Sequence, residues 1–261
     1  MNLHVRFAVI ALLSASATGI YALPPLRARC TIRPSENAQK LSLHIYDGEC
    51  GQDHHRDCGT TSNDEPLNRF TGVSLADLSR EGAQLTATLS AEAGTFTCTG
   101  TVHDGVLSGE SLFLPEAAFV DRMGQMGFTG FDSEKLQAYA FVKVDSGYVR
   151  SLQQTKIGGI TTDNLIALRI FNVDPTYINS ITALGYEVPD ADKLIGLRVQ
   201  GVEANEVREI RMLGYRPSLD EMIQIRIFHI TPDFIRRMQS RGLKDLTIAK
   251  LVQIRIFNLA D

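Results

Sequence analysis

The sequence has no excess of positive charge. Its 261 residues include 26 Lys and Arg against 30 Asp and Glu, a net charge of −4. Residues 1–114 carry 8 basic and 12 acidic residues, whereas residues 115–261 carry 18 of each. A nucleic-acid-binding surface needs clustered Lys and Arg to neutralise phosphates, so we expect no nucleic-acid partner.

Signature motifs of common catalytic sites are also missing. The chain contains no Gly-rich phosphate loop, no Gly-x-Ser-x-Gly elbow, no His-Glu-x-x-His and no Cys-His pair that would keep a free thiol. His54 and His55 stand between Cys50 and Cys58, but this spacing fits no common zinc pattern. We therefore expect no catalytic residue, no metal ligand and no cofactor. The polar residues 59–69 are predicted to form a mobile loop.

No cysteine follows Cys98, so the last 163 residues must be held together by packing alone. The four cysteines form an even set, which indicates disulfides in an exported chain. Cys98 lies on the inward face of its predicted strand, and Cys30 shares a face with Ile32. We predict a buried Cys30–Cys98 bond and a local Cys50–Cys58 clip, although four cysteines allow three connectivities.

A long uncharged run occurs only at the N-terminus. Arg6 is followed by the apolar run Phe7–Leu13 and by the small-x-small site Ala15-Ser-Ala17. This order is typical of a secretory signal peptide, which we assign to residues 1–22, with cleavage after Ala17 or after Ala22. Retention as an anchor is the alternative, because residues 7–26 carry no charge. After cleavage we expect no membrane attachment and a secreted or periplasmic location.

Residues 23–114 are predicted to form a small antiparallel β domain with two disulfides. Apolar and polar residues alternate over 41–46, 85–90 and 95–102, as in half-buried strands. Asp104-Gly105 suits a two-residue hairpin turn before a further strand, Val106–Leu114. Cys30–Arg33 is a candidate fifth strand. One face of this sheet needs a cover, from a second sheet or from the residues that follow.

Residues 115–261 contain an internal repeat. Leu165–Val173 has close copies at Leu194–Val202, Met222–Ile230 and Leu251–Leu259 and a weaker copy at Leu136–Val144, at a spacing of 28 or 29 residues. Each unit divides into two short helical segments, here called helix one and helix two. Such repeats stack on their neighbours, so we predict an α-solenoid of about five helical-hairpin repeats. The expected fold class is therefore α+β.

Helix boundaries recur in register. Helix one is predicted to begin at Pro115, Pro175 and Pro232 and to stop at Gly127, Gly185, Gly214 and Gly242, with Lys156 in place of glycine in the second unit. Helix two is predicted to be capped by Asp132, Thr161, Asp190, Ser218 and Thr247.

Helix two is apolar on nearly all sides, so we expect it to be the inner helix, with Phe171, Phe228 and Phe257 in the core. The last copy has no following unit to cover it. Either it folds back or it docks on a partner, for example on a second copy of the chain in a homodimer.

Helix two also carries a row of arginines, here called the arginine ladder: Arg169, Arg198, Arg226 and Arg255, with Ala140 in the first unit. A guanidinium among apolar residues is costly unless it is paired. One interpretation is structural, with each arginine bonded to helix-end carbonyls or to a nearby acid such as Asp174 or Glu203. The other is a stripe of planar donors for carboxylate or phosphate groups of a partner.

The repeat form Leu-Ile-Ala-Leu-Arg-Ile-x-x-Val-x-Pro-x-Tyr-Ile, ending in Leu-Gly-Tyr, is read from residues 165–186. It resembles repeats of uncharacterised exported bacterial proteins, of the kind also appended to BlaR-type (M56-like) membrane metallopeptidases. The similarity covers residues 115–261, and the peptidase part is absent. The resemblance implies a bacterial cell-envelope setting and brings no catalytic residue with it.

Three functions are compatible with these observations. The first is a non-catalytic scaffold that binds a protein or peptide through its solenoid surface. The second is a regulatory or inhibitory module for a cell-envelope enzyme. The third is an unrecognised hydrolase or carbohydrate binder centred on the β domain, which a polar cleft over the sheet with converging carboxylates would favour.

Overall fold

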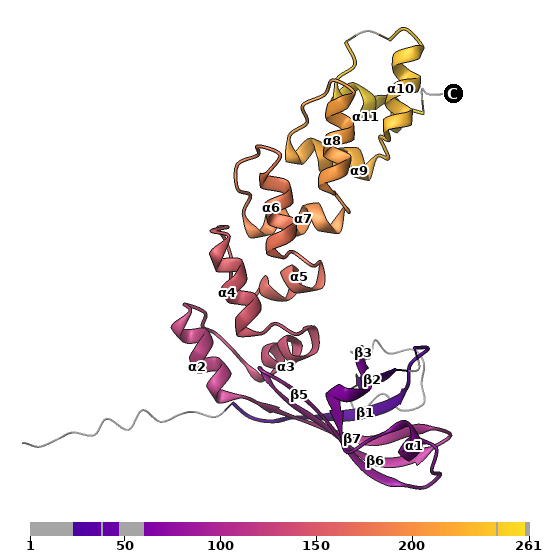
Figure 1. Cartoon of the computed structure of the whole chain (residues 1–261), viewed down its shortest axis with the longest axis vertical. Helices are drawn as coiled ribbons and strands as arrows, with labels where there is room; N and C mark the ends of the chain where they lie inside the picture. The colour runs from indigo at the N-terminus through magenta and orange to yellow at the C-terminus, as the bar shows by residue number, and fades with distance from the viewer. Residues whose placement is uncertain (1–22, 38, 47–59, 244, 259–261) are drawn as a thin grey trace, which may run out of the picture.

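The computed structural model describes residues 23–37, 39–46, 60–243 and 245–258 and has an α+β fold. The predicted signal peptide and the predicted Cys50–Cys58 bond lie outside these residues. A curled antiparallel sheet stands at one end, and a column of short helices rises from it (Figure 1). The strands of the sheet are β1 (Leu26–Pro34), β2 (Lys40–Tyr46), β3 (Thr60–Pro66), β4 (Phe70–Thr71), β5 (Gln84–Ala91), β6 (Gly94–His103) and β7 (Val106–Pro115).

The sheet consists of two meanders that join through their first and last strands. The strand order is β3-β2-β1-β7-β6-β5-β4, so β1 pairs with β7 and the edge strands are β3 and β4. A 3-10 turn, η1 (Leu67–Arg69), connects the meanders, and a short helix, α1 (Leu75–Leu78), lies between β4 and β5 of the second one. The predicted strands in 30–46 and 85–114 are all present.

Two sequence predictions in this region are wrong. Residues 60–66 form the edge strand β3, which pairs along its whole length with β2, whereas we expected a mobile loop. Strand β3 is polar because much of it faces solvent at the sheet edge, so it lacks the apolar alternation of the inner strands. Pro115, expected at a helix start, is instead the last residue of β7 and lies opposite Gly94.

The predicted Cys30–Cys98 disulfide is present and buried. The two residues are 0% and 2% exposed, and their Cα atoms lie 5.9 Å apart. They belong to β1 and β6, which β7 separates in the sheet order. Close approach of β6 and β7 depends on two facing glycines, Gly100 and Gly109. A Cβ on Gly109 would stand 1.9 Å from the Thr99 carbonyl oxygen, and a Cβ on Gly100 would stand 2.0 Å from the Ser108 carbonyl oxygen.

The helices that follow are here called the helical array. They are α2 (Ala117–Gln125), α3 (Ser133–Val142), α4 (Ser146–Gln154), α5 (Leu165–Ile170), α6 (Pro175–Thr182), α7 (Ala191–Val199), α8 (Ala204–Met212), α9 (Leu219–Ile227), α10 (Pro232–Ser240) and α11 (Ile248–Ile256). Each sequence unit therefore contains two helices. Successive helices two are in contact, α3 with α5, α5 with α7, α7 with α9 and α9 with α11. In the lower part of the column they follow one side, opposite α2, α4 and α6 (Figure 1).

Helix caps explain why such short helices begin and end where they do. All five predicted caps of helix two accept a hydrogen bond from the backbone N–H three residues later: Asp132, Thr161, Asp190, Ser218 and Thr247. The four stop glycines have φ values between 75° and 94°, and Lys156 takes the same left-handed region at 60°. Positive φ values also occur just after helix two, at Lys143, Asn172, Gly201 and His229. Caps and stops thus confirm the predicted register except at the start of α5, which begins at Leu165 with Asn164 at its N-cap position, so Thr161 caps only the turn before it.

Gly185→Ala is expected to lower the free energy of unfolding by about 1 kcal/mol. Gly185 has φ 83° and no atom within 4 Å of an added Cβ, so backbone strain alone accounts for the loss. Urea denaturation followed by circular dichroism measures it. Gly124→Ala is the control, because Gly124 lies inside α2 without positive φ and an added Cβ also meets nothing there. Equal stability of the Gly185→Ala variant and the wild type would refute the stop assignment.

Helix α3 is the cover that the sheet requires. It contacts β5, β6 and β7, and the Phe141 ring packs edge-on against Phe96, with 4.8 Å between ring centroids. The side-chain amide of Asn63 in β3 donates to the Phe141 carbonyl, and the Lys143 ammonium lies 2.9 Å from the Glu65 carboxylate. Glu65 is only 1% exposed. Sheet and array therefore share one apolar core.

A second contact joins the β5–β6 turn to the start of α4. The Glu92 carboxylate accepts hydrogen bonds from the backbone N–H and hydroxyl of Ser146 and from Arg122. Partial burial acts to raise the pKa of Glu92, but the bonds from Ser146 and the charge of Arg122 outweigh it, and the pKa is lowered.

Among the described residues, no helix is long and apolar enough to cross a membrane.

Candidate binding surface

The arginine ladder lies at the seams between units. Each guanidinium donates to a carbonyl at the C-terminal end of the preceding helix two, at 2.9–3.3 Å. The bonds run from Arg169 to Val142, from Arg198 to Phe171 and Asn172, from Arg226 to Gln200 and from Arg255 to His229. A helix end leaves its last carbonyls without partners inside the helix, so each arginine completes the helix below it in the column.

A helix one lies in sequence between each arginine and the carbonyl that it bonds, and this helix supplies a second partner for the guanidinium. Arg169 and Arg198 lie over the rings of Tyr148 and Tyr177, at 4.9 and 4.4 Å from the ring centroids, and Arg255 lies 4.2 Å from that of Phe234. In the fourth unit a carboxylate replaces the ring: Glu206 pairs with Arg226 at 3.3 Å. Partial burial raises the pKa of Glu206, and the nearby charge and hydrogen bond of Arg226 offset only part of this rise. Ring faces and carboxylates both attract a guanidinium.

The same tyrosines also bond to the end of the helix two of their own unit. The hydroxyls of Tyr148 and Tyr177 each donate to a carbonyl 25 residues later, of Val173 and Val202, at 2.9 Å. Burial raises the pKa of both hydroxyls. These contacts favour the structural interpretation of the ladder, and a binding role for it stays a prediction.

Arg198→Ala is expected to lower the free energy of unfolding by about 1–3 kcal/mol, because it leaves two carbonyls and the Tyr177 ring without their cation. Chemical denaturation measures the loss. Arg208→Ala is the matched control, since Arg208 is exposed and bonds only Asn205 on its own helix; its effect should stay within about 0.5 kcal/mol. Equal effects of the two substitutions would contradict the seam assignment.

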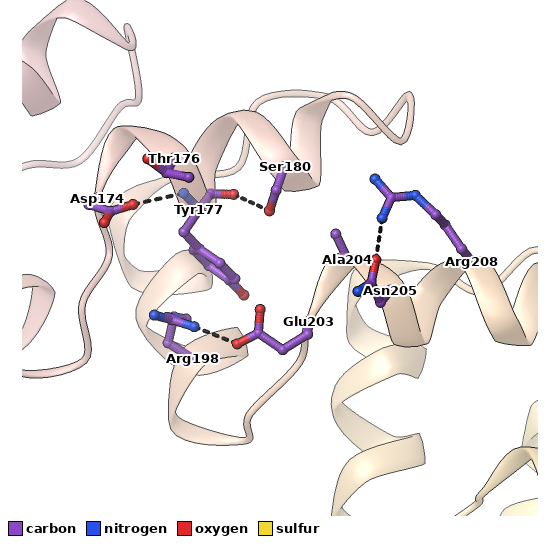
Figure 2. Close-up of a pocket in the computed structure, with 9 residues that line it drawn as sticks. All are labelled: Asp174, Thr176, Tyr177, Ser180, Arg198, Glu203, Ala204, Asn205 and Arg208. Carbon is purple, nitrogen blue, oxygen red and sulfur yellow. Dashed lines mark hydrogen bonds and ion pairs between the residues drawn. The ribbon is translucent and has the colours of Figure 1, made fainter.

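A shallow hollow of about 410 Å³ opens beside Arg198, between the third and fourth units. Figure 2 shows Arg198 turned toward Glu203 and Arg208 turned toward Asn205. Its walls are Asp174, Thr176, Tyr177, Ser180, Arg198, Glu203, Ala204, Asn205 and Arg208. Two carboxylates face two guanidiniums, so the hollow offers no one-sided charge to a ligand.

The array also exposes a regular row of aliphatic side chains. The aliphatic row consists of Ile170, Val199, Ile227 and Ile256, each directly after a ladder arginine and each 48–54% exposed. Phe171 and Phe257, expected in the core, are 37% and 67% exposed, so that prediction is wrong for both. The sequence did not predict the exposed row, because an apolar residue on a short helix is assigned to the core whether or not a neighbour covers it.

Partly covered residues extend the row into a band. One turn earlier on the same face stand Ile166, Ile195 and Ile223, which are partly buried, whereas their equivalent in the last unit, Val252, is buried. The Ile223 Cδ1 lies 3.8 Å from where a Cβ on Gly196 would stand, so a side chain of the fourth unit reaches the helix two of the third. The band is therefore continuous across at least the α7–α9 seam.

Acidic side chains border this band on the side of the helix starts. Asp192 and Asp220 stand seven residues before the row, on the same face of α7 and α9 and about 10 Å away, and Asp163 takes the equivalent place in the turn before α5. Each accepts from a side chain of the preceding unit: Lys135, Asn164 and Lys193. Asp163 and Asp220 nevertheless remain 83% and 73% exposed.

The sheet carries a separate polar hollow of about 690 Å³. Arg33, Pro34, Ser35, Glu36, Ser42, His44, Ser62, Asn63 and Asp64 line it. The hydroxyls of Ser35 and Ser42 donate to the Asp64 carboxylate, and the Ser35 bond contributes most to lowering its pKa.

Within the described parts of the chain, no three His, Cys, Asp or Glu side chains lie close enough together to hold a metal ion. The acidic and His-containing loop around Cys50–Cys58 lies outside these parts. Comparison of the sequence with models of known protein families, with curated proteins and with solved structures finds no match in any of the three.

Proposed function

We propose that the chain is an exported, non-catalytic protein that binds a protein or peptide through the exposed face of its helices two. In this account the array is an α-solenoid, and the sheet covers its first unit. The observation that carries the proposal is the aliphatic row, which repeats one exposed apolar side chain per unit over four units. Contiguous exposed apolar surface on a soluble protein is typical of interaction sites.

Two features support export. The Cys30–Cys98 bond requires an oxidising compartment to form and persist. The N-terminal run of uncharged residues is the signal that would bring the chain there. We place the protein in the secreted or periplasmic fraction of a bacterial cell, in agreement with the resemblance of its repeats.

Affinity capture with a matched pair of variants tests the proposal. The row variant carries Ile170→Ser, Val199→Ser, Ile227→Ser and Ile256→Ser; all four positions are about half exposed, so the fold should survive. The control variant carries Val188→Ser and Met212→Ser, which remove exposed apolar side chains outside the row. The wild type and the control variant should retain the same protein from a cell-envelope extract, and the row variant should lose it. Equal retention by all three would refute the proposal.

A further inference from the structure

We propose that the polar hollow of the sheet is a binding site for a neutral saccharide, held by hydrogen bonds to its hydroxyl groups. This site is separate from the aliphatic row and gives the chain a second ligand. Three observations lead to it: polar side chains brought together by the strand register, hydrogen-bonding groups without a partner in the described chain, and opposite charges that offset each other.

The hollow lies on the face of the sheet that the helical array does not cover. Successive side chains of a strand point to opposite faces. Glu65 pairs with Lys143 of the array, so its neighbour Asp64 points away from the array. Leu43, on the inner side of β2, is only 2% exposed. The hollow is therefore built on the outer side of a packed sheet, whose core holds the strands beneath it in place.

The pairing of three strands brings polar side chains together in this hollow. Arg33 of β1 lies opposite Ser42 of β2, and Ser42 lies opposite Asp64 of β3 on its other side. Neighbouring strands are about 4.8 Å apart, so the backbone positions of Arg33 and Asp64 are separated by roughly 10 Å. His44 and Ser62 form the next outward pair of β2 and β3, about 7 Å along the strands. All of these residues line the hollow.

Much of the hydrogen-bonding capacity of these side chains is left for a ligand. The side chains of Arg33, His44 and Ser62 make no hydrogen bond or ion pair with another described residue. Two serine hydroxyls orient the Asp64 carboxylate and lower its pKa, so it is an acceptor at neutral pH. A carboxylate has about four lone-pair sites, so Asp64 can still accept hydrogen bonds from a ligand.

The residues of the hollow fit an uncharged ligand that is rich in hydroxyl groups. Glu36 and Asp64 offset the charge of Arg33, so a ligand of one charge sign would meet a like charge. Pro34 is the one apolar residue among the described lining residues, and an apolar ligand would leave the others without partners. A hydroxyl group both donates and accepts. Hydroxyls of one sugar can therefore donate to Asp64 and accept from Arg33.

Ligand-observed nuclear magnetic resonance titrations of the full mature chain test the inference. The probes are four neutral disaccharides, cellobiose, maltose, lactose and N,N′-diacetylchitobiose, with glycylglycine and inorganic phosphate for comparison. At least one disaccharide should bind saturably, and the dipeptide and phosphate should not. Arg33→Gln and Asp64→Asn should each weaken that binding at least 10-fold. Ser62→Ala should weaken it too, and it removes a hydroxyl that bonds no described residue, so the fold should survive.

Arg29→Gln and Glu110→Gln are the matched controls. Arg29 and Glu110 are exposed, lie opposite each other in the register of β1 and β7, and do not line the hollow. Arg29 stands four residues before Arg33 and therefore points to the same face of β1. Both control variants should bind the disaccharide as the wild type does.

Absence of binding to all four disaccharides overturns the inference, and so does binding that the three hollow variants leave unchanged. Tighter binding of glycylglycine would show that the separated charges hold a zwitterion, and tighter binding of phosphate would show an anion site at Arg33; either result contradicts the inference. The row variant should bind the disaccharide as the wild type does. Capture of a protein from the envelope extract is a separate measurement, so failure of either proposal leaves the other in place.

Discussion

Phe96→Ala is expected to lower the free energy of unfolding by about 3–5 kcal/mol. Phe96 is 2% exposed and lies between Phe113 of the sheet and Phe141 of the array, with ring centroids at 4.7 and 4.8 Å. Its removal leaves a cavity where the two parts of the chain meet. Because the apolar core runs without a break from sheet to array, the sheet and the first helices should lose stability in the same transition.

A double-mutant cycle with Phe141→Ala identifies the contact itself. Near- and far-ultraviolet circular dichroism in a urea titration gives the stability of each variant. The coupling energy between Phe96 and Phe141 should be about 0.5–1.5 kcal/mol, as for other aromatic pairs. Strict additivity, or a sheet transition that leaves the helical signal of the first unit unchanged, would contradict a shared core.

Cys30→Ala with Cys98→Ala is expected to lower stability by about 4 kcal/mol, because the bond closes a loop of 68 residues and constrains the unfolded chain. The bond also holds β1 to β6 across β7, where Gly100 and Gly109 let the strands approach. The variant should therefore show a lower denaturation midpoint than the wild type in the absence of reductant.

Cys50→Ala with Cys58→Ala is the matched control. If these residues form the short clip predicted from the sequence, its loss should cost about 2–3 kcal/mol, less than loss of the long-range bond. A larger effect from the 50–58 pair than from the 30–98 pair would contradict the assignment of Cys30–Cys98 as the principal covalent constraint of the sheet.

The sequence predicted helix boundaries better than surfaces. Caps such as Asp190 and stops such as Gly185 act through bonds and dihedral angles within a few residues, so local sequence suffices to find them. Even the substitution of glycine by Lys156 keeps the left-handed geometry, as the repeat register required. The Cys30–Cys98 pairing could likewise be inferred, because strand alternation places both sulfurs on the inner face.

Strand β3 escaped prediction for a physical reason. The most buried of its residues with described burial is Glu65, whose carboxylate accepts from Asn63 of the same strand and pairs with Lys143 of the helical array. Hydrophobic alternation cannot identify a strand whose inward position is charged. The partner that makes its burial tolerable lies 78 residues away along the chain, in the first unit.

The exposure of the aliphatic row could not be predicted from the sequence, for the opposite reason. Phe141, Ile170, Val199, Ile227 and Ile256 occupy one repeat position and are all apolar, so the sequence treats them alike. The structure separates them, because the sheet covers Phe141 and no described residue covers the other four to the same extent. The signal that could have shown the difference is the position itself: only the first unit follows directly after a β domain.

Amide hydrogen–deuterium exchange of the wild-type chain, with and without the protein that it captures from the envelope extract, tests the central claim most directly. The account predicts slower exchange on binding in residues 166–171, 195–200, 223–228 and 252–257, the segments that carry the aliphatic row. Exchange in residues 33–36, 42–44 and 62–64, around the polar hollow of the sheet, should not change. Protection confined to that hollow, with the four row segments unaffected, would contradict the account.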